Sequence, residues 1–322
     1  ERAFSFAPEC EISLEANPGS TVRHLAGWRA AGIHRLTIGA QSFDDADLQF
    51  LGRRHTAAEA LDAMRAARAA GFANLGIDLI YGLPGQFERW TSTLRTATLL
   101  QPEHISAYGL TWEHNTPLWR MLQRGEVQKC AEDEERDMFL IAMRMLAEAG
   151  YEQYEISNFC RPGFRSRHNS AYWDLTPFLG LGPAAHSFRD ARRWWNVRDV
   201  QIYIARLGDG VQPIEGEEKL TPADRARELI LLGLRRREGI DLAELSRLLQ
   251  KDKGVIKKRL LTLFGGLAET DPFERSLADE LLTCKEDRLG VTRQGLLLYD
   301  SICEKLFSLV NEEPAARQAR PK

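Results

Sequence analysis

The sequence contains few cysteines, and none lies close to another. Its 322 residues include five, at Cys10, Cys130, Cys160, Cys284 and Cys303. An odd and scattered set argues against a disulfide framework and is typical of a reducing compartment. Metal and cluster sites usually take two or three cysteines within a few residues. The sequence therefore predicts no metal site within this chain.

Long apolar runs and an excess of either charge are also missing. No stretch reaches the roughly 18 apolar residues of a membrane span. The first residues, Glu1-Arg2-Ala3-Phe4, do not have the layout of a signal peptide. Basic residues number 43 and acidic residues 46, a net charge of −3, which gives no electrostatic reason to expect a nucleic-acid partner. We expect a cytoplasmic protein with no integral membrane segment and no nucleic-acid partner.

Short β-rich runs alternate with helical stretches through the first half of the chain. This alternation predicts βαβ units and a parallel sheet. Strands are expected over 11–16, 34–38, 74–81, 103–110 and 152–158, and helices over 21–31, 57–70, 88–100, 117–122 and 132–149. The units are few for a closed barrel, so we expect that earlier units are missing from this chain.

The second half changes in character. Residues 159–183 have few regular signals and are expected to form an aromatic, arginine-rich loop, and 208–218 is expected to be a polar linker. Amphipathic helices are predicted over 222–237, 242–249, 255–267 and 292–307. The expected domains are 1–150, an extension over 151–215, a helical domain over 216–310 that resembles a winged helix, and a loose tail over 311–322. Its basic patch makes DNA binding a less favoured alternative.

Polar residues follow the ends of the predicted parallel strands, where α/β proteins place their active sites. Glu15 and Asp78 can accept hydrogen bonds from hydroxyls or an ammonium, Arg53 can hold a carboxylate, and Gln41 can donate and accept. We expect these four side chains to converge around one nucleoside-sized cavity. Each has a structural alternative, since a strand-end acid often caps the next helix.

Several runs resemble the radical S-adenosylmethionine (SAM) family of coproporphyrinogen III oxidase-like proteins. They are Glu-Ala-Asn-Pro at 15–18, Arg-Leu-Thr-Ile-Gly-Ala-Gln-Ser-Phe at 35–43, Leu-Gly-Arg-Arg-His at 51–55, Ile-Asp-Leu-Ile-Tyr-Gly-Leu-Pro-Gly-Gln at 77–86, Tyr-Glu-Ile-Ser-Asn at 154–158 and Gly-Leu-Gly-Pro-Ala-Ala-His-Ser at 180–187. The resemblance implies that Glu15, Gln41, Arg53 and Asp78 contact S-adenosyl-L-methionine, together with the backbone near Thr111.

The family's defining Cys-x3-Cys-x2-Cys segment, which holds a [4Fe-4S] cluster, is not in this sequence. The resemblance implies that the cluster cysteines precede Glu1 and that the chain is an N-terminally truncated fragment, unable by itself to bind the cluster or cleave the cofactor reductively. The expected fold is α/β. It comprises a partial radical-SAM (β/α)6 barrel without its first two βα units and a small, mainly helical, winged-helix-like C-terminal domain.

A second motif, His168-Asn169-x-x-Tyr172-Trp173, resembles that of the heme-chaperone (HemW-type) branch of the family. Histidine and tyrosine are competent axial ligands of heme iron, and tryptophan can stack on a porphyrin. The structural alternative is a loop held in place by its aromatic residues. The resemblance favours a chaperone that binds heme and transfers it to an unidentified acceptor protein. The alternative is an oxygen-independent coproporphyrinogen III oxidase, so enzymatic activity is left open.

Two further side chains are weaker candidates for the heme ligand. His186 lies in Gly182-Pro183-Ala184-Ala185-His186, a sequence that predicts a buried turn, and Cys160 belongs to no recognised heme motif. The sequence leaves the choice of ligand open.

Overall fold

The computed structural model describes residues 6–19, 22–265 and 281–311. The predicted tail lies outside the described residues apart from Asn311. The chain divides into two compact units, Glu1–His168 and Asn169–Lys322, so the predicted limits at 150 and 215 differ from this division. Each unit is described by itself. No described helix is both long enough and apolar enough to cross a membrane.

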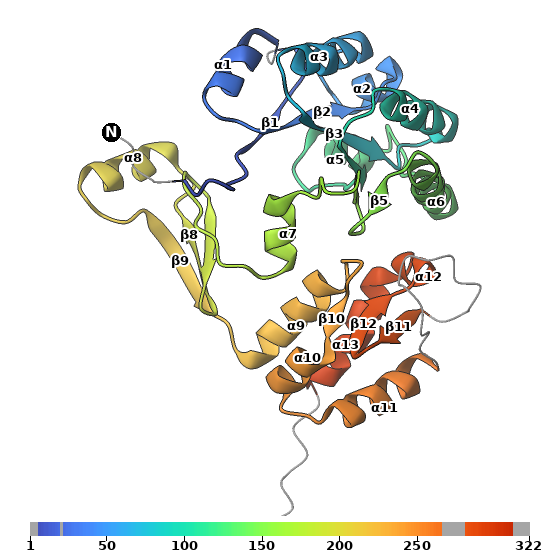
Figure 1. Ribbon diagram of the computed structural model, residues 1–322, viewed down its shortest axis with the longest axis vertical. Helices are drawn as coiled ribbons and strands as arrows, with labels where there is room; N and C mark the ends of the chain where they lie inside the picture. The colour runs from blue at the N-terminus through green and yellow to red at the C-terminus, as the bar shows by residue number, and fades with distance from the viewer. Residues whose placement is uncertain (1–5, 20–21, 266–280, 312–322) are drawn as a thin grey trace, which may run out of the picture. The chain divides into compact units, whose positions relative to one another are not determined.

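The first unit is built on a six-stranded mixed sheet in the order β1-β2-β3-β4-β6-β5 (Figure 1). The strands β1 (Ser13–Ala16), β2 (Arg35–Gln41), β3 (Asn74–Tyr81) and β4 (His104–Gly109) are parallel, as predicted. The strand predicted over 152–158 is instead two short antiparallel ones, β5 (Glu152–Gln153) and β6 (Asn158–Cys160). The chain turns between them because Glu155 Oε1 accepts hydrogen bonds from the Ser157 amide at 2.9 Å and from Asn158 Nδ2.

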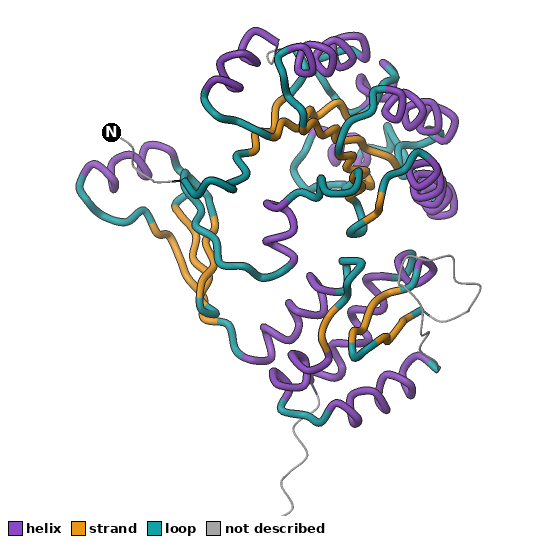
Figure 2. Tube along the Cα trace, viewed as in Figure 1, coloured by secondary structure: helices purple, strands orange, loops and turns teal. Residues whose placement is uncertain are grey.

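Helices cover one face of this sheet (Figures 1 and 2). The first unit contains η1 (Val22–His24), α1 (Leu25–Ala30), α2 (Asp45–Phe50), α3 (Ala57–Ala69), α4 (Phe87–Leu99), α5 (Pro117–Gln123) and α6 (Glu132–Glu148). Thr56 and Glu59 close a capping box at the start of α3. Trp90 of α4 is fully buried and donates its indole N–H to the Met138 carbonyl of α6 at 2.9 Å, which ties these two helices together.

The two faces of the sheet differ because side chains alternate along each strand. Leu36, Ile38, Leu75, Ile77 and Ile105 lie on the helix-covered face and have no exposed surface. Burial of a side chain of this size contributes about 1.5–3 kcal/mol. This apolar face therefore forms the core that holds the strands in position.

The opposite face, termed the inner face, carries polar groups and glycines. The register pairs Glu15 of β1 with Thr37 of β2 and Thr37 with Gly76 of β3. It also pairs Asp78 of β3 with Ser106 of β4. Residues far apart in sequence thus form one continuous polar surface.

The first part of the second unit is a three-stranded antiparallel sheet, β7 (His186–Arg189), β8 (Arg192–Asn196) and β9 (Ile214–Lys219), with helix α8 (Val200–Gly208) between β8 and β9. The predicted polar linker over 208–218 is wrong for Glu215–Glu218, which belong to β9. Glu217 and Glu218 pair across the sheet with Arg192 and Arg193. The acidic run therefore belongs to an exposed strand that forms ion pairs with its neighbour, and it is not a linker.

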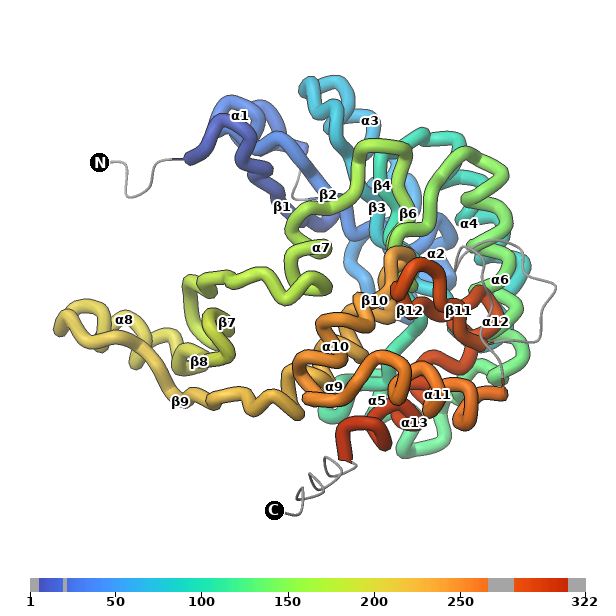
Figure 3. Tube along the Cα trace, turned by 60° about the horizontal axis from the view of Figure 1, so that its bottom comes forward, coloured from blue at the N-terminus to red at the C-terminus, as the bar shows by residue number. Residues whose placement is uncertain are grey.

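The remainder of the second unit packs helices around a second three-stranded antiparallel sheet, in the order β10-β12-β11 (Figure 3). The strands are β10 (Ile240–Asp241), β11 (Leu282–Lys285) and β12 (Arg288–Val291). The helices are α9 (Pro222–Gly233), α10 (Leu242–Leu249), α11 (Lys253–Phe264), α12 (Arg293–Leu296) and α13 (Tyr299–Asn311). The single helix predicted over 292–307 is two helices.

The predicted basic patch near α11 is partly neutralised. Lys253 and Lys257 both form ion pairs with Asp287, and the Lys251 ammonium donates to the Leu309 carbonyl at 2.8 Å. These contacts offset part of the positive charge of the patch.

Candidate functional site

Two carboxylates dominate the inner face. Burial raises the pKa of Asp78 to about 6; a hydrogen bond with Ser106 opposes this rise, and the negative charge of Glu15 adds to it. The guanidinium of Arg35 lowers the pKa but does not cancel the effect. An acid that is hard to ionise beside a second acid favours a ligand that donates hydrogen bonds or carries positive charge.

Tyr108 belongs to the same cluster. Burial raises the pKa of its phenol, the Ser106 hydrogen bond opposes the rise, and the charges of Asp78, Glu155 and Glu15 add to it. The tyrosine therefore stays protonated beside the two acids. The sequence did not identify Tyr108 or Ser106 as a neighbour of Asp78, because only the pairing of β3 with β4 joins them.

Gln41 ends β2 in an unusual backbone conformation. Its φ is +68°, in the left-handed region that L-residues seldom adopt, and its side chain is 8% exposed. A Cβ on Gly39 would lie 2.7 Å from Gln41 Nε2 and 3.5 Å from Asn17 Oδ1. Gly39 therefore makes room for the two amides on the inner face, a role that the sequence did not reveal.

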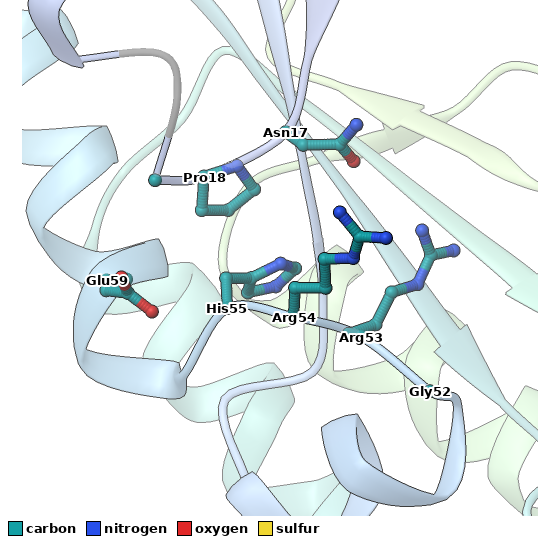
Figure 4. A pocket seen from close by; sticks show the side chains of 8 residues that line it. Asn17, Pro18, Gly52, Arg53, Arg54, His55 and Glu59 are labelled. Carbon is teal, nitrogen blue, oxygen red and sulfur yellow. The ribbon is translucent and has the colours of Figure 1, made fainter.

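A pocket of about 560 Å³ is bordered by Asn17 (Figure 4). Its lining includes Asn17, Arg53, Arg54, His55 and Glu59. Both arginine head groups extend to the same side of the loop that carries them, towards Asn17. A pair of guanidinium groups suits a carboxylate or another anion.

His55 fixes the loop that carries the arginines. Its Nε2 lies 3.0 Å from the Ala40 carbonyl of β2, and the ring is 8% exposed. Gly52, with φ of +65°, lets the chain turn between α2 and this loop. The position of Arg53 is thus set by a short turn and one buried histidine contact.

Of the predicted SAM-contacting residues, Glu15 and Asp78 are brought together on the inner face. Gln41 lies against Gly39 next to Asn17, and Arg53 lines the pocket that Asn17 also borders. Thr111 is exposed after β4, and its carbonyl accepts from the Glu113 amide at 3.2 Å. Of the four side chains expected around one cavity, only Arg53 lines this pocket, and the convergence of all four stays a prediction.

Another strand-end feature of the sequence proves to be structural. Gln86, at the end of the 77–86 motif, is fully buried, and its amide donates to Asp47 Oδ2 at 2.9 Å. Asp47 also accepts from Ser42 at 3.0 Å and from Arg89 at 2.7 Å. This network fastens the loop after β3 to α2 and α4, so Gln86 supports the site without being available to a ligand.

At the amino-terminal ends of β2, β3 and β4, the inner face is occupied by side chains that hydrogen-bond to one another. Arg35 donates to Asn74 at 3.2 Å and to the Phe164 carbonyl at 3.1 Å, and His104 Nε2 lies 2.8 Å from the Tyr154 hydroxyl. Burial, with a smaller contribution from Arg35, lowers the pKa of His104 well below its ordinary value. The imidazole is neutral, and this end of the face is filled by side chains.

The His-Asn-x-x-Tyr-Trp motif lies on a helix, α7 (Arg167–Trp173), where the sequence predicted an irregular loop. In a helix, residues four apart share a face, so His168 lies one turn from Tyr172 and Asn169 one turn from Trp173. The first turn is favoured by Glu11, whose Oε1 accepts from the Arg167 amide at 3.2 Å. His168 is exposed.

Aromatic and ionic contacts anchor the last turn of α7 within the second unit. Tyr172 meets the edge of Phe178 at a centroid distance of 4.8 Å, and the Arg235 guanidinium lies 3.9 Å from the centre of the Trp173 ring. Asp174 forms an ion pair with Arg236. Tyr172 and Trp173 therefore have structural contacts of their own.

These features define a class, the Radical SAM superfamily, whose sequence pattern matches residues 1–97; the pattern of the HemN C-terminal domain matches residues 220–298. The structure of coproporphyrinogen III oxidase (HemN) from Escherichia coli superposes with a TM-score of 0.73 at 23% identity, covering 95% of this chain and 71% of that one. This likeness shows the shared fold.

Within that class, the chain belongs to the HemW heme chaperone family. It is 37% identical over 306 residues to "Heme chaperone HemW" of Mycobacterium tuberculosis, covering 94% of this chain and 73% of the relative. It is 34% identical over 299 residues to the protein of the same name from Bacillus subtilis, with 91% and 74% covered. It is also 33% identical to the mitochondrial "Radical S-adenosyl methionine domain-containing protein 1" of Mus musculus, with 97% and 70% covered.

Proposed function

We propose that this chain binds heme and passes it to an acceptor protein, and that its inner face takes S-adenosylmethionine. The first unit then acts as a partial (β/α)6 barrel, and the helices after β9 form a winged-helix-like domain. The observation that carries the heme part is helix α7, which exposes His168 while Tyr172 and Trp173 are held by neighbours. An exposed imidazole on a helix suits the reversible capture of heme iron.

The residues of the first unit fit S-adenosylmethionine. When bound, this cofactor supplies a carboxylate, an ammonium, a sulfonium and a ribose diol. The arginines of the pocket would hold the carboxylate through their paired N–H groups. Glu15 and Asp78 would accept from the ammonium or the diol, which would relieve their mutual repulsion. Gln41 and the backbone near Thr111 complete the set.

The iron–sulfur cluster does not fit the residues of this structure. Among the residues that the structure describes, no group of three His, Cys, Asp or Glu side chains could hold a metal ion. None of the five cysteines forms a disulfide, and burial raises the pKa of Cys130, Cys160 and Cys303 to about 11. These thiols are unsuited to be thiolate ligands of a cluster.

The heme proposal is tested by titrating the chain with hemin and following the absorbance of the bound porphyrin. His168→Ala should weaken binding on the order of tenfold or more. His114→Ala is the matched control, since His114 is also exposed and lies against a tryptophan, Trp119. Apomyoglobin should then withdraw the heme from the loaded chain. Absence of hemin binding, or conversion of coproporphyrinogen III to protoporphyrinogen, would contradict the proposal.

The cofactor proposal is tested separately by equilibrium dialysis with labelled S-adenosylmethionine. Arg53→Ala should reduce binding by about tenfold, because a charge-assisted bond to a carboxylate contributes about 1.5–3 kcal/mol. Arg65→Ala is the control, because Arg65 lies on the outer surface of α3 with 68% of its side chain exposed. Equal binding by both variants would remove Arg53 from the site.

A further inference from the structure

An aromatic surface covers one face of the β7-β8-β9 sheet. The register pairs His186 with Trp195 and Phe188 with Arg193, and residues paired in this way point to the same side. Phe178 bridges to Phe188 through two 2.9 Å backbone hydrogen bonds. We call the group of Phe178, Phe188, Trp195 and His186 the aromatic shelf.

One end of the shelf contacts helix α7 through Phe178. Tyr172 meets Phe178 at 4.8 Å, and Phe178 lies 6.3 Å from Phe188 between ring centroids. All these residues belong to the second unit. The shelf therefore continues from the helix that carries the heme-chaperone motif. Phe188 is only 5% exposed, so Phe178, Trp195 and His186 are the members of the shelf that a flat apolar ligand can contact.

His186 stands at the exposed end of the shelf. The sequence predicted a buried turn here, but the residue is an exposed member of β7. Its ring stacks on Trp195 at 5.7 Å with an interplanar angle of 29°. Trp195 in turn lies across Gly216, where an added Cβ would be 2.5 Å from the indole. The glycine lets the indole lie close to the sheet, and the imidazole rests on that indole.

The contacts of His186 leave its nitrogens available. Stacking uses the face of the ring, and within the described residues neither nitrogen makes a hydrogen bond. By contrast, the buried rings of His55 and His104 each have a partner at 3.0 Å or less. An orientationally fixed imidazole with a free nitrogen beside aromatic rings has what a heme ligand needs.

Another exposed histidine, His24, shows that stacking on a tryptophan does not by itself indicate a heme ligand. His24 lies on Trp28 at 5.8 Å and 30°, almost the geometry of His186, but its Nε2 accepts a hydrogen bond from Arg23 at 3.1 Å. The His24 pair belongs to η1 and α1 of the first unit and has no aromatic sheet beside it. His186 therefore differs from His24 in two respects: its nitrogens make no hydrogen bond among the described residues, and it lies on the aromatic shelf.

We propose that His186 is an axial ligand of heme iron, with the porphyrin lying against the aromatic shelf. The inference rests on the proposed heme-binding function and adds a ligand on a strand to the motif histidine on α7. The iron would take one imidazole nitrogen, while Trp195 behind the ring fixes its orientation.

The test uses the full chain and two probes, hemin and metal-free protoporphyrin IX. Iron ligation predicts that His186→Ala weakens hemin binding about tenfold and shifts the bound spectrum towards a five-coordinate, high-spin form. Binding of the metal-free porphyrin should change less than about twofold, because it has no iron to ligate. Added imidazole should restore the wild-type spectrum. His24→Ala is the control and should leave both probes unaffected.

The outcomes separate this inference from the function on which it rests. If His168→Ala loses hemin and His186→Ala keeps the wild-type affinity and spectrum, the His186 ligand is refuted and the heme function stands. Equal weakening of both probes by His186→Ala would show a packing role and also refute ligation. If the wild-type chain binds no hemin, the proposed function fails, and this inference fails with it.

Discussion

Replacing Asp78 with asparagine should stabilise the ligand-free chain while weakening its affinity for S-adenosylmethionine. Burial and the charge of Glu15 penalise the Asp78 carboxylate in the folded state. Asparagine keeps the size of the side chain and its ability to bond Ser106, but it carries no charge. A residue of a binding site often lowers the free energy of unfolding of the ligand-free protein, because its side chain is arranged for the ligand.

The magnitude follows from the pKa. Folding raises it from the ordinary value of 3.8 to about 6, and each pKa unit corresponds to about 1.4 kcal/mol. The penalty is thus up to about 3 kcal/mol. It applies where the carboxylate is charged, so it is absent below about pH 4, grows between about pH 4 and pH 6, and is complete above pH 6.

The assay is thermal or urea unfolding of both proteins from pH 4 to pH 8 without cofactor. At pH 7.5 the variant should unfold about 6–12 °C higher, given about 2–4 °C for each kcal/mol in a unit of this size, and the difference should vanish near pH 4. Asp47→Asn provides a control of opposite sign. Asp47 is fully buried and accepts from Arg89 at 2.7 Å, and the Arg89 side chain is 37% exposed, so replacement of Asp47 should cost about 1–3 kcal/mol. A less stable Asp78→Asn variant, or a gain independent of pH, would refute the reasoning.

Three further changes test the supports of the two sites. Gly39→Ala should displace the Gln41 amide, 2.7 Å from the new methyl position, and weaken S-adenosylmethionine binding several-fold in dialysis. His55→Ala removes the 3.0 Å contact to β2 and should lower the free energy of unfolding by about 1–3 kcal/mol in urea titration. Trp173→Ala removes the ring that Arg235 lies against. It should lower the free energy of unfolding by about 2 kcal/mol, and it should also lower the affinity for hemin.

Gly27→Ala is the control for the glycine variant. An added Cβ at Gly27 has no atom within 4 Å, and alanine is the better helix former by about 1 kcal/mol. It should therefore leave cofactor binding unchanged and slightly raise the unfolding temperature of the chain. Equal cofactor binding by Gly39→Ala and Gly27→Ala would show that Gly39 does not position the Gln41 amide.

Local sequence patterns predicted most elements of the first unit. The strand over 74–81 and the helices beginning at Ala57, Pro117 and Glu132 occur as expected, because their periodicity and caps lie within a few neighbouring residues. The hairpin of β7 and β8 was missed. Its strands are short, and they are fixed by cross-strand pairs such as Phe188 with Arg193, which no local pattern reveals.

The sequence by itself determined the parallel order of β1 to β4, the residues at their ends and the family to which the chain belongs. Only the tertiary structure decided which of those residues share a face, because strand register joins Asp78 to Ser106 and Glu15 across long separations. It also decided that Gln86 is a buried support and that His186 is exposed. Exposure and charge coupling depend on what packs against a residue, and that is set by contacts between distant parts of the chain.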